Sequence, residues 1–187
     1  MTTNILVVCT ANQCRSPLAA AALRHEVDRR ELAVEIGPVE IRSAGLGDEG
    51  VPATSATVRA GAALGLDLTA HRSQRVDAKL VGGADLVIGM ERQHVREATI
   101  LDPTAFGRAF TLKELVRRGE AVGPRGSEPI AEWLARVHAG RRGADLLGAS
   151  PADDVADPTT SRIVDHSMMA DEVTDLAARL VTLLWGP

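Results

Sequence analysis

The sequence predicts an α/β fold, a parallel sheet with helices on both faces. Two observations carry this prediction. Short apolar runs of strand length alternate along the chain with amphipathic stretches of helical period. The clearest of these runs are continuously apolar, as is typical of strands that are buried on both faces. The length of 187 residues suits one domain with a sizeable core, so we expect residues 1–187 to form a single domain.

The first half of the chain contains two expected strands and two expected helices. The run Asn4–Cys9 (NILVVC) is the first strand. A helix follows it, with Ser16 as a suitable N-cap and Pro17 in the first helical position, where its missing N–H costs nothing. A short strand is expected at Val39–Ala44 and a helix-like stretch at Thr54–Leu64.

The second half continues the alternation. Ala84–Met90 (ADLVIGM) is expected to be a buried strand, and a short helix follows it from Glu91. A weak strand ends at Phe110. Thr111–Glu114 has the spacing of a capping box and opens a helix that we expect to stop at Gly119. The last helix carries an apolar residue at every third or fourth position, namely Met169, Val173, Leu176, Leu180 and Leu183.

The segment at about 119–156 differs from the rest of the chain. Its two ends are rich in Gly, Pro, Ser and Ala, and we expect them to be loops. Between them lies one amphipathic helix, on which Trp133 belongs to an apolar face, so we expect this side chain to pack in the core. Arg141 and Arg142 most simply complete the C-terminus of that helix.

Composition excludes several classes of protein. Apolar residues make up 45% of the chain and charged residues 25%, which is the balance of a soluble globular protein. No uncharged apolar run reaches the roughly 18 residues of a membrane span, and the N-terminus lacks the basic start of a signal peptide. The formal charge of -4 disfavours nucleic acid as a partner. Two cysteines form no secreted disulfide framework, so we expect a cytoplasmic protein with no membrane partner.

Both cysteines lie in the stretch CTANQCRSPL at residues 9–18, between the first strand and the first helix. A loop in this position binds oxyanions well, because its backbone N–H groups and the helix dipole point at the ligand. A helix N-terminus and a nearby arginine also favour the thiolate of a cysteine, which is its nucleophilic form. Cys9 is therefore a candidate nucleophile and Arg15 a two-pronged clamp for phosphate oxygens. The hydroxyl of Ser16 can donate to the thiolate.

Two simpler interpretations compete with this one. A lone cysteine at the end of a buried strand is usually just a small hydrophobic residue. The combination of Cys9 with Arg15 and Ser16 at this spacing favours a functional loop instead. A closed metal site needs about four ligands, and two cysteines without spaced histidines fall short of that number, so we expect no metal and no cofactor.

Several motifs together resemble one family. VCTANQCRSP resembles the phosphate-binding signature of the low-molecular-weight protein tyrosine phosphatases, a family that also contains thioredoxin-coupled arsenate reductases and protein arginine phosphatases. Ser43-Ala44-Gly45, His71-Arg72-Ser73 and ADLVIGMERQHV resemble further family motifs, and Asp157-Pro158 stands where the family places its catalytic aspartate. The resemblance implies a four-stranded parallel sheet, a cysteinyl-phosphate intermediate and no metal. The segment at about 119–156 is longer than the family usually has.

The resemblance and the chemistry together imply a role for each site residue. Cys9 attacks phosphorus, and Arg15 holds the equatorial oxygens together with the loop amides. Asp157 is the expected general acid and later the base that activates water. Asp102, which precedes Pro103, is its rival but does not match the family's position. The residues expected to bind phosphate are Thr10, Ala11, Asn12, Gln13, Cys14, Arg15 and Ser16.

Other residues are expected to support the loop. Asn12 and Ser43 resemble a family pair whose hydrogen bond holds the loop, and Asn12 tolerates the left-handed conformation that a tight loop needs. His71 is expected to be a structural histidine. Cys14 resembles a second loop cysteine of the family, which can form a disulfide with Cys9 and shield it from irreversible oxidation. The remaining histidines are expected at the surface or as helix caps, namely His25, His94, His138 and His166.

The residues that select the substrate depart from the family pattern. Thr159 and Thr160 follow Pro158, where tyrosine-specific members usually carry aromatic residues, and Gln13 replaces a bulky aliphatic residue. Three functions stay open. The leading one is a phosphomonoester hydrolase acting on a phosphorylated protein or a small phosphoester. The second is an arsenate reductase that uses an external thiol, or a protein arginine phosphatase. The third is a non-catalytic module that binds phosphate, sulfate or arsenate.

Overall fold

In the part of the chain that the structure describes, four parallel strands form one sheet, as expected, and their order is β2-β1-β3-β4. The computed structural model describes residues 2–30, 37–161 and 163–186. The strands are β1 (Thr3–Cys9), β2 (Val39–Gly45), β3 (Leu86–Gly89) and β4 (Ala109–Thr111). Because Cys9 pairs with Gly45 and Val8 pairs with Gly89, the carboxyl ends of the central strands meet at one edge of the sheet.

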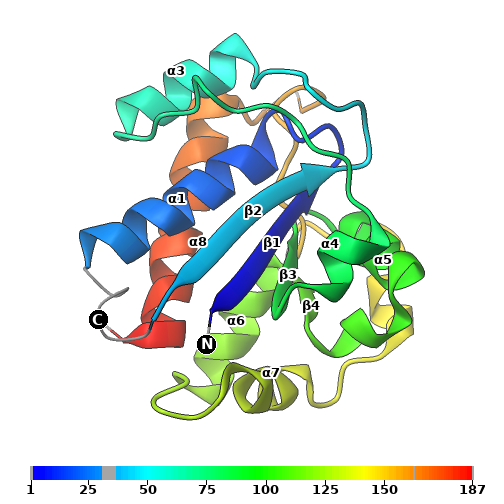
Figure 1. Cartoon of the computed structure of the whole chain (residues 1–187). Helices are drawn as coiled ribbons and strands as arrows, with labels where there is room; N and C mark the ends of the chain where they lie inside the picture. Colours follow the sequence, from blue (N-terminus) through cyan, green and yellow to red (C-terminus); the bar gives the residue numbers. More distant parts are fainter. Residues whose placement is uncertain (1, 31–36, 162, 187) are drawn as a thin grey trace.

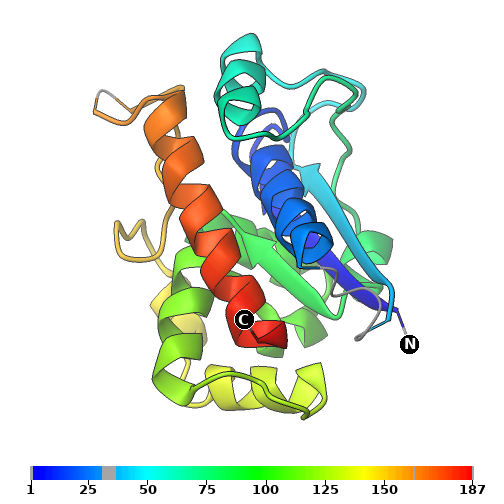
Figure 2. The same ribbon diagram turned by 90° about the vertical axis from the view of Figure 1, so that its left-hand side faces the viewer.

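Helices cover both faces of the sheet (Figure 1). One face carries α1 (Arg15–Arg29), α6 (Leu112–Val122) and α8 (His166–Trp185), and Figure 2 shows α1 and α8 side by side. The other face carries α4 (Ala78–Gly82), α5 (Arg92–Leu101) and the 3-10 helix η1 (Pro103–Gly107). The helix α3 (Ser55–Ala63) packs against α8 beside the carboxyl edge. Each face of the sheet has its own hydrophobic core, because successive residues of β1 point to opposite faces. Ile5 and Val7 belong to the core on the α1 and α8 side, and Leu6 and Val8 belong to the core on the α5 side.

The helix α6 runs on through Gly119 to Val122, so the expected stop at Gly119 is wrong. The glycine is there for packing. A Cβ atom at this position would lie 3.0 Å from both a ring carbon of Trp133 and a methyl of Leu183, so a side chain here would force these neighbours to move apart. Trp133 itself is fully buried, as expected, and its indole N–H donates to the carbonyl of Gly123 at 2.9 Å.

The helix α7 (Ile130–His138), which carries Trp133, lies at the amino ends of the strands, opposite the carboxyl edge (Figure 1). Arg141 does not complete its C-terminus. The guanidinium is buried, donates to both carboxylate oxygens of Glu114 at 2.8 and 3.1 Å, and lies 4.1 Å from the ring centroid of Phe110. This ion pair ties the long segment to α6 and β4, and the chain then enters the 3-10 helix η2 (Gly143–Leu146). Among the described residues, no helix is long and apolar enough to cross a membrane.

Candidate active site

Cys9 ends β1, and its sulfur faces into the loop that leads to α1. The sulfur accepts a hydrogen bond from the backbone N–H of Asn12 at 3.2 Å and another from the hydroxyl of Ser16 at 2.9 Å. The helix begins at Arg15 with Cys14 as its N-cap, so the expectation of Ser16 as N-cap is wrong. Ser16 lies in the first turn of α1, and its hydroxyl donates to the sulfur instead of capping the helix. Donated hydrogen bonds and a helix N-terminus both favour negative charge on sulfur.

Asn12 shapes the loop. Its φ of 53° is the one positive value at a non-glycine residue in the described part of the chain. Its side chain donates to Ser16 Oγ at 2.8 Å and accepts from the backbone N–H of Gln74 at 2.9 Å. The ring Nε2 of His71 lies 2.6 Å from the Asn12 carbonyl oxygen, so the histidine supports the loop from outside.

The expected hydrogen bond between Asn12 and Ser43 does not form. Ser43 pairs with Val7 in the sheet, two residues before Gly45, and the loop passes over β2 only at Gly45. A Cβ atom on Gly45 would lie 2.7 Å from the Asn12 nitrogen and 2.8 Å from the Thr10 oxygen. Glycine is required there because the two backbones touch. The following two N–H groups, of Leu46 and Gly47, both donate to the Thr10 carbonyl, at 2.7 and 3.0 Å.

Arg15 is buried and lies under the loop, where three segments reach it. One terminal nitrogen donates to the carboxylate of Glu91 and, at 3.0 Å, to the carbonyl of Val155. The other donates to Asp157 Oδ2 at 2.8 Å and lies 3.5 Å from Thr10 Oγ1. The guanidinium thus joins the loop after β1 to the segment that carries Asp157, which is 142 residues further along the chain.

The two carboxylate oxygens of Asp157 have different partners, one in its own turn and one in the site. Oδ1 accepts from the Thr159 backbone N–H at 2.9 Å and its hydroxyl at 2.7 Å, while Oδ2 faces Arg15. Burial raises the pKa of Asp157, but the hydrogen bonds from Thr159 and the charge of Arg15 outweigh it, so this pKa lies below its usual value. Asp102, the rival, caps η1 through Thr104 and pairs with Arg108. It lies at the end of α5 that is remote from the loop.

Two site residues were not singled out as such from the sequence. Glu91, the N-cap of α5, holds Arg15. His94 was expected at the surface or as a cap; it does cap α5, but it is fully buried. Its Nδ1 accepts from the Glu91 N–H at 3.0 Å, which leaves the proton on Nε2 to donate to Thr10 Oγ1 at 3.1 Å. The signal was the Glu91-x-x-His94 spacing directly after a strand. Burial and the charge of Arg15 lower the pKa of His94 to about 3, so the ring is neutral at pH 7.

Cys14 is buried at the start of α1 and, like Cys9, is a free thiol. Its sulfur lies 3.5 Å from Thr54 Oγ1 and 4.0 Å from Nε2 of His166, the first residue of α8. The backbone N–H groups of Gln13 and Cys14 donate to no acceptor among the described residues, so they are available to an oxyanion. Within the same residues, no group of three or more His, Cys, Asp or Glu side chains is arranged to hold a metal ion.

Comparisons with known proteins agree with this geometry. The family model of low molecular weight phosphotyrosine protein phosphatase matches residues 4–122. A probable low molecular weight protein-tyrosine-phosphatase of Ralstonia solanacearum, EpsP, is 37% identical over 116 residues, which cover 62% of this chain and 74% of that protein. A protein-arginine-phosphatase of Geobacillus stearothermophilus is 35% identical over 137 residues, 70% of this chain and 84% of that protein.

A solved structure extends the likeness beyond the matched segment. The low molecular weight protein tyrosine phosphatase from T. tengcongensis is 27% identical, and the alignment covers 97% of this chain and 99% of that chain with a TM-score of 0.70. The family model spans well over half of the chain and includes the whole loop from Cys9 to Ser16. The chain therefore belongs to the low molecular weight phosphotyrosine protein phosphatase family and is a phosphatase of the cysteine-dependent, protein-tyrosine-phosphatase type.

Proposed function

We propose that this enzyme hydrolyses phosphomonoesters by transferring the phosphoryl group to the sulfur of Cys9. The observation that carries the proposal is the pair of hydrogen bonds that the sulfur accepts from Asn12 and Ser16, in the loop that leads to Arg15 at the start of α1. The thiolate attacks phosphorus, a phosphorus–sulfur bond forms, and the bond to the leaving oxygen breaks. Water then attacks the phosphocysteine, and the sulfur departs again as the thiolate that those two donors stabilise.

Asp157 is proposed as the acid of the first step and the base of the second. Its Oδ1 already accepts two hydrogen bonds from Thr159, so Oδ2 is the oxygen that carries the transferred proton. In the free site the hydrogen bonds from Thr159 and the charge of Arg15 hold the pKa of this carboxyl below its usual value, so it is ionised near neutral pH. A bound phosphate dianion attracts the guanidinium and adds negative charge beside Asp157, and both effects favour protonation of the carboxylate. Substrate binding thereby prepares the acid.

The proposed substrate is a phosphorylated protein, with a small phosphoester as the alternative. Relatives of this chain bear the names of both tyrosine and arginine phosphatases. Thr159, which stands where tyrosine-specific members usually carry an aromatic residue, donates its hydroxyl hydrogen bond to Asp157, and the half-buried Gln13 is polar. These two observations keep phosphoarginine as a second candidate. We place the enzyme in the cytoplasm because both thiols are free, and propose no nucleic-acid or membrane partner.

A substrate panel tests the proposal. Release of phosphate is measured from p-nitrophenyl phosphate, a phosphotyrosine peptide and a phosphoarginine peptide. In a further arm, formation of arsenite is measured with arsenate and a small thiol. We expect hydrolysis that Cys9→Ser abolishes and that Arg15→Lys severely lowers, because a point charge does not replace a two-pronged clamp. Both variants are expected to keep the fold. Full activity in Cys9→Ser contradicts the mechanism, and binding of phosphate without turnover of any substrate indicates a non-catalytic module.

A further inference from the structure

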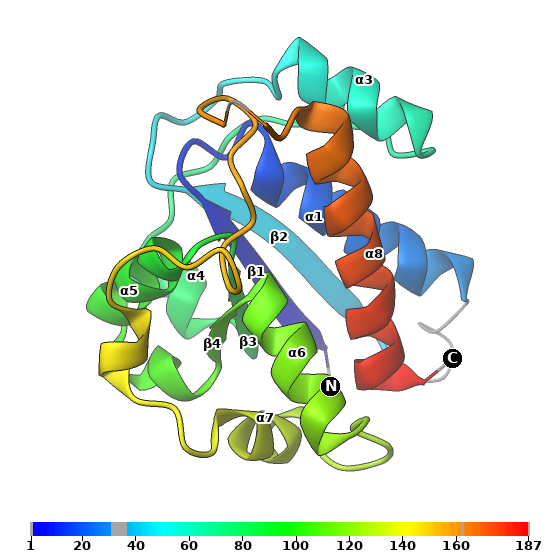
Figure 3. The same cartoon turned by 180° about the vertical axis from the view of Figure 1, so that it is seen from behind.

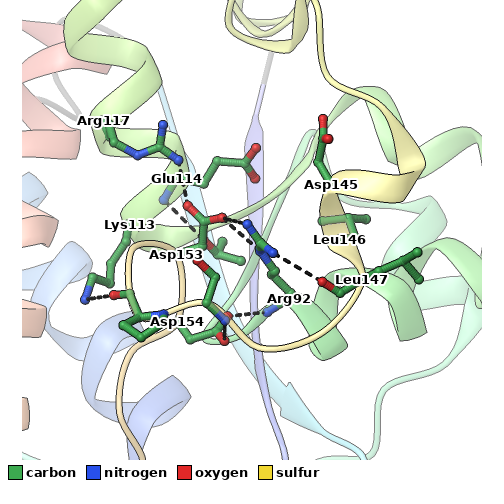
Figure 4. Close-up of polar contacts among 12 residues, drawn as sticks. Arg92, Lys113, Glu114, Arg117, Asp145, Leu146, Leu147, Asp153 and Asp154 are labelled. Carbon is green, nitrogen blue, oxygen red and sulfur yellow. Dashed lines mark hydrogen bonds and ion pairs between the residues drawn. The ribbon is translucent and has the colours of Figure 1, made fainter.

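The segment from Leu147 to Asp157 runs along the carboxyl edge of the sheet to the loop before α8 (Figure 3). Acidic residues within it are anchored on the first residue of α5, Arg92 (Figure 4). We infer that the ion pair between Arg92 and Asp153 positions the catalytic acid, and that Asp153 and Arg92 are positioning residues for proton transfer by Asp157. The inference rests on the proposed role of Asp157.

The carboxylate of Asp153 is buried and fully used. Oδ2 accepts from Nε and from a terminal nitrogen of Arg92, at 2.9 and 2.6 Å, and Oδ1 accepts from Arg117 at 2.6 Å. Burial raises the pKa of Asp153, but the hydrogen bonds from Arg92 and Arg117 outweigh it, so the pKa lies below its usual value. The Asp153 carboxyl is therefore ionised in the folded enzyme near neutral pH. Two-pronged arginine pairs fix direction as well as distance.

A second aspartate anchors the backbone at the same point. Asp154 Oδ1 accepts from the backbone N–H of Arg92 at 2.8 Å, and Oδ2 accepts from the N–H of Ser150 at 2.7 Å. The first free N–H of α5 is thus capped by the segment rather than by water. Lys113 of α6 adds a contact to the carbonyl of Pro151 at 2.9 Å. The segment is held from two helices at once.

These anchors lie close to the reacting groups. Directly after Asp154, the N–H of Val155 donates to the carbonyl of Met90 at 2.8 Å, and the Val155 carbonyl accepts from Arg15. Asp157 follows two residues later, so the chain between Asp153 and Asp157 spans at most about 14 Å. Glu91, which holds Arg15, is the immediate neighbour of Arg92. The start of α5 therefore sets both the phosphate clamp and the acid, and a shift of about 1 Å in such a group lowers rates by up to about 100-fold.

The test compares leaving groups. Rates of Asp153→Asn are measured with p-nitrophenyl phosphate, which needs little protonation, and with phenyl phosphate, which needs an early proton. We expect a loss of about 10-fold to 100-fold in kcat/KM for phenyl phosphate, less than about threefold for p-nitrophenyl phosphate, and unchanged inhibition by inorganic phosphate. The comparison uses kcat/KM because it reports only the transfer to Cys9, in which the leaving group departs, and not the later hydrolysis that both substrates share. Asp102→Asn is the matched control, since Asp102 also pairs with an arginine, Arg108 at 2.8 Å, but caps η1 and lies away from the site. It should leave the ratio of the two rates unchanged.

Asp157→Asn and the double variant separate the two claims. If the ion pair between Arg92 and Asp153 acts through Asp157, adding Asp153→Asn to Asp157→Asn lowers the ratio of the phenyl phosphate rate to the p-nitrophenyl phosphate rate no further, because the two changes are coupled. A selective loss in Asp157→Asn together with an equal loss on both substrates in Asp153→Asn overturns the inference and leaves the acid in place. An unchanged ratio in Asp157→Asn overturns the acid assignment, and the inference with it. Where Asp153→Asn fails to fold, Arg92→Lys, which keeps the charge and loses the fork, must show the same selectivity in smaller measure.

Discussion

Replacement of the buried His94 tests the electrostatics of the site through folding. The ring is fully buried, and its pKa is lowered to about 3 by burial and by Arg15. In the unfolded chain a histidine titrates near pH 6.5. As the pH falls below 6.5, protons therefore bind the unfolded chain first, and the folded state loses stability until the pH reaches about 3. Between pH 7 and pH 5 this loss is about 2 kcal/mol from His94 alone.

The variant His94→Asn keeps an acceptor for the N–H of Glu91 but removes the titrating group. Urea unfolding of both proteins at pH 7 and pH 5 gives the free energy of unfolding at each pH. The wild type should lose about 2 kcal/mol more than the variant over this interval. All other groups titrate in both proteins and cancel in the comparison. Parallel curves for the two proteins would refute a neutral, buried His94.

Three further predictions follow from the same contacts. Gly45→Ala should destabilise the fold by about 1–3 kcal/mol and weaken phosphate binding, because its Cβ would meet the loop backbone at 2.7 Å. Gly47→Ala, whose Cβ would lie 3.5 Å from its nearest neighbour, should do neither. Equal stability of the two variants in thermal unfolding contradicts the packing argument. Asp157→Asn should bind inorganic phosphate as well as or slightly better than the wild type, since one negative charge beside Arg15 is removed; calorimetry showing much weaker binding opposes this. Peroxide should inactivate the enzyme reversibly through a Cys9–Cys14 disulfide, and mass spectrometry that finds only sulfonic acid on Cys9 counts against that role of Cys14.

The fold and the position of the loop after β1 were predictable because their signals are local. The continuous apolar run of β1 and the loop after it lie within a few residues of each other, and the strand-to-helix context locates an oxyanion site. The pattern after β3 likewise predicts a helix near Glu91. Backbone geometry at Asn12 follows from its tolerance of the left-handed region, and the observed φ of 53° agrees.

The remaining features depend on contacts between distant segments. Gly119 behaves as a stop signal in isolation, and only the packing of Trp133 against it shows why the helix continues. The buried pair of Arg141 and Glu114 and the pair of Arg92 and Asp153 join residues that are 27 and 61 positions apart. Ion pairs of this kind leave no periodic pattern, because their members have opposite charge and belong to different elements. Surface and buried charges look alike in sequence, and burial is decided by tertiary packing.

The central claim, that Cys9 carries the phosphoryl group, is tested most directly by trapping the intermediate. Asp157→Asn, which lacks the proposed base for hydrolysis, is mixed with p-nitrophenyl phosphate, quenched in acid within milliseconds, and mapped by mass spectrometry. We predict a phosphorylated peptide with the modification on Cys9, formed together with a burst of nitrophenol and absent when Cys9→Ser is added. Turnover without any phosphorylated peptide, or phosphate found on Cys14 instead, would contradict the account.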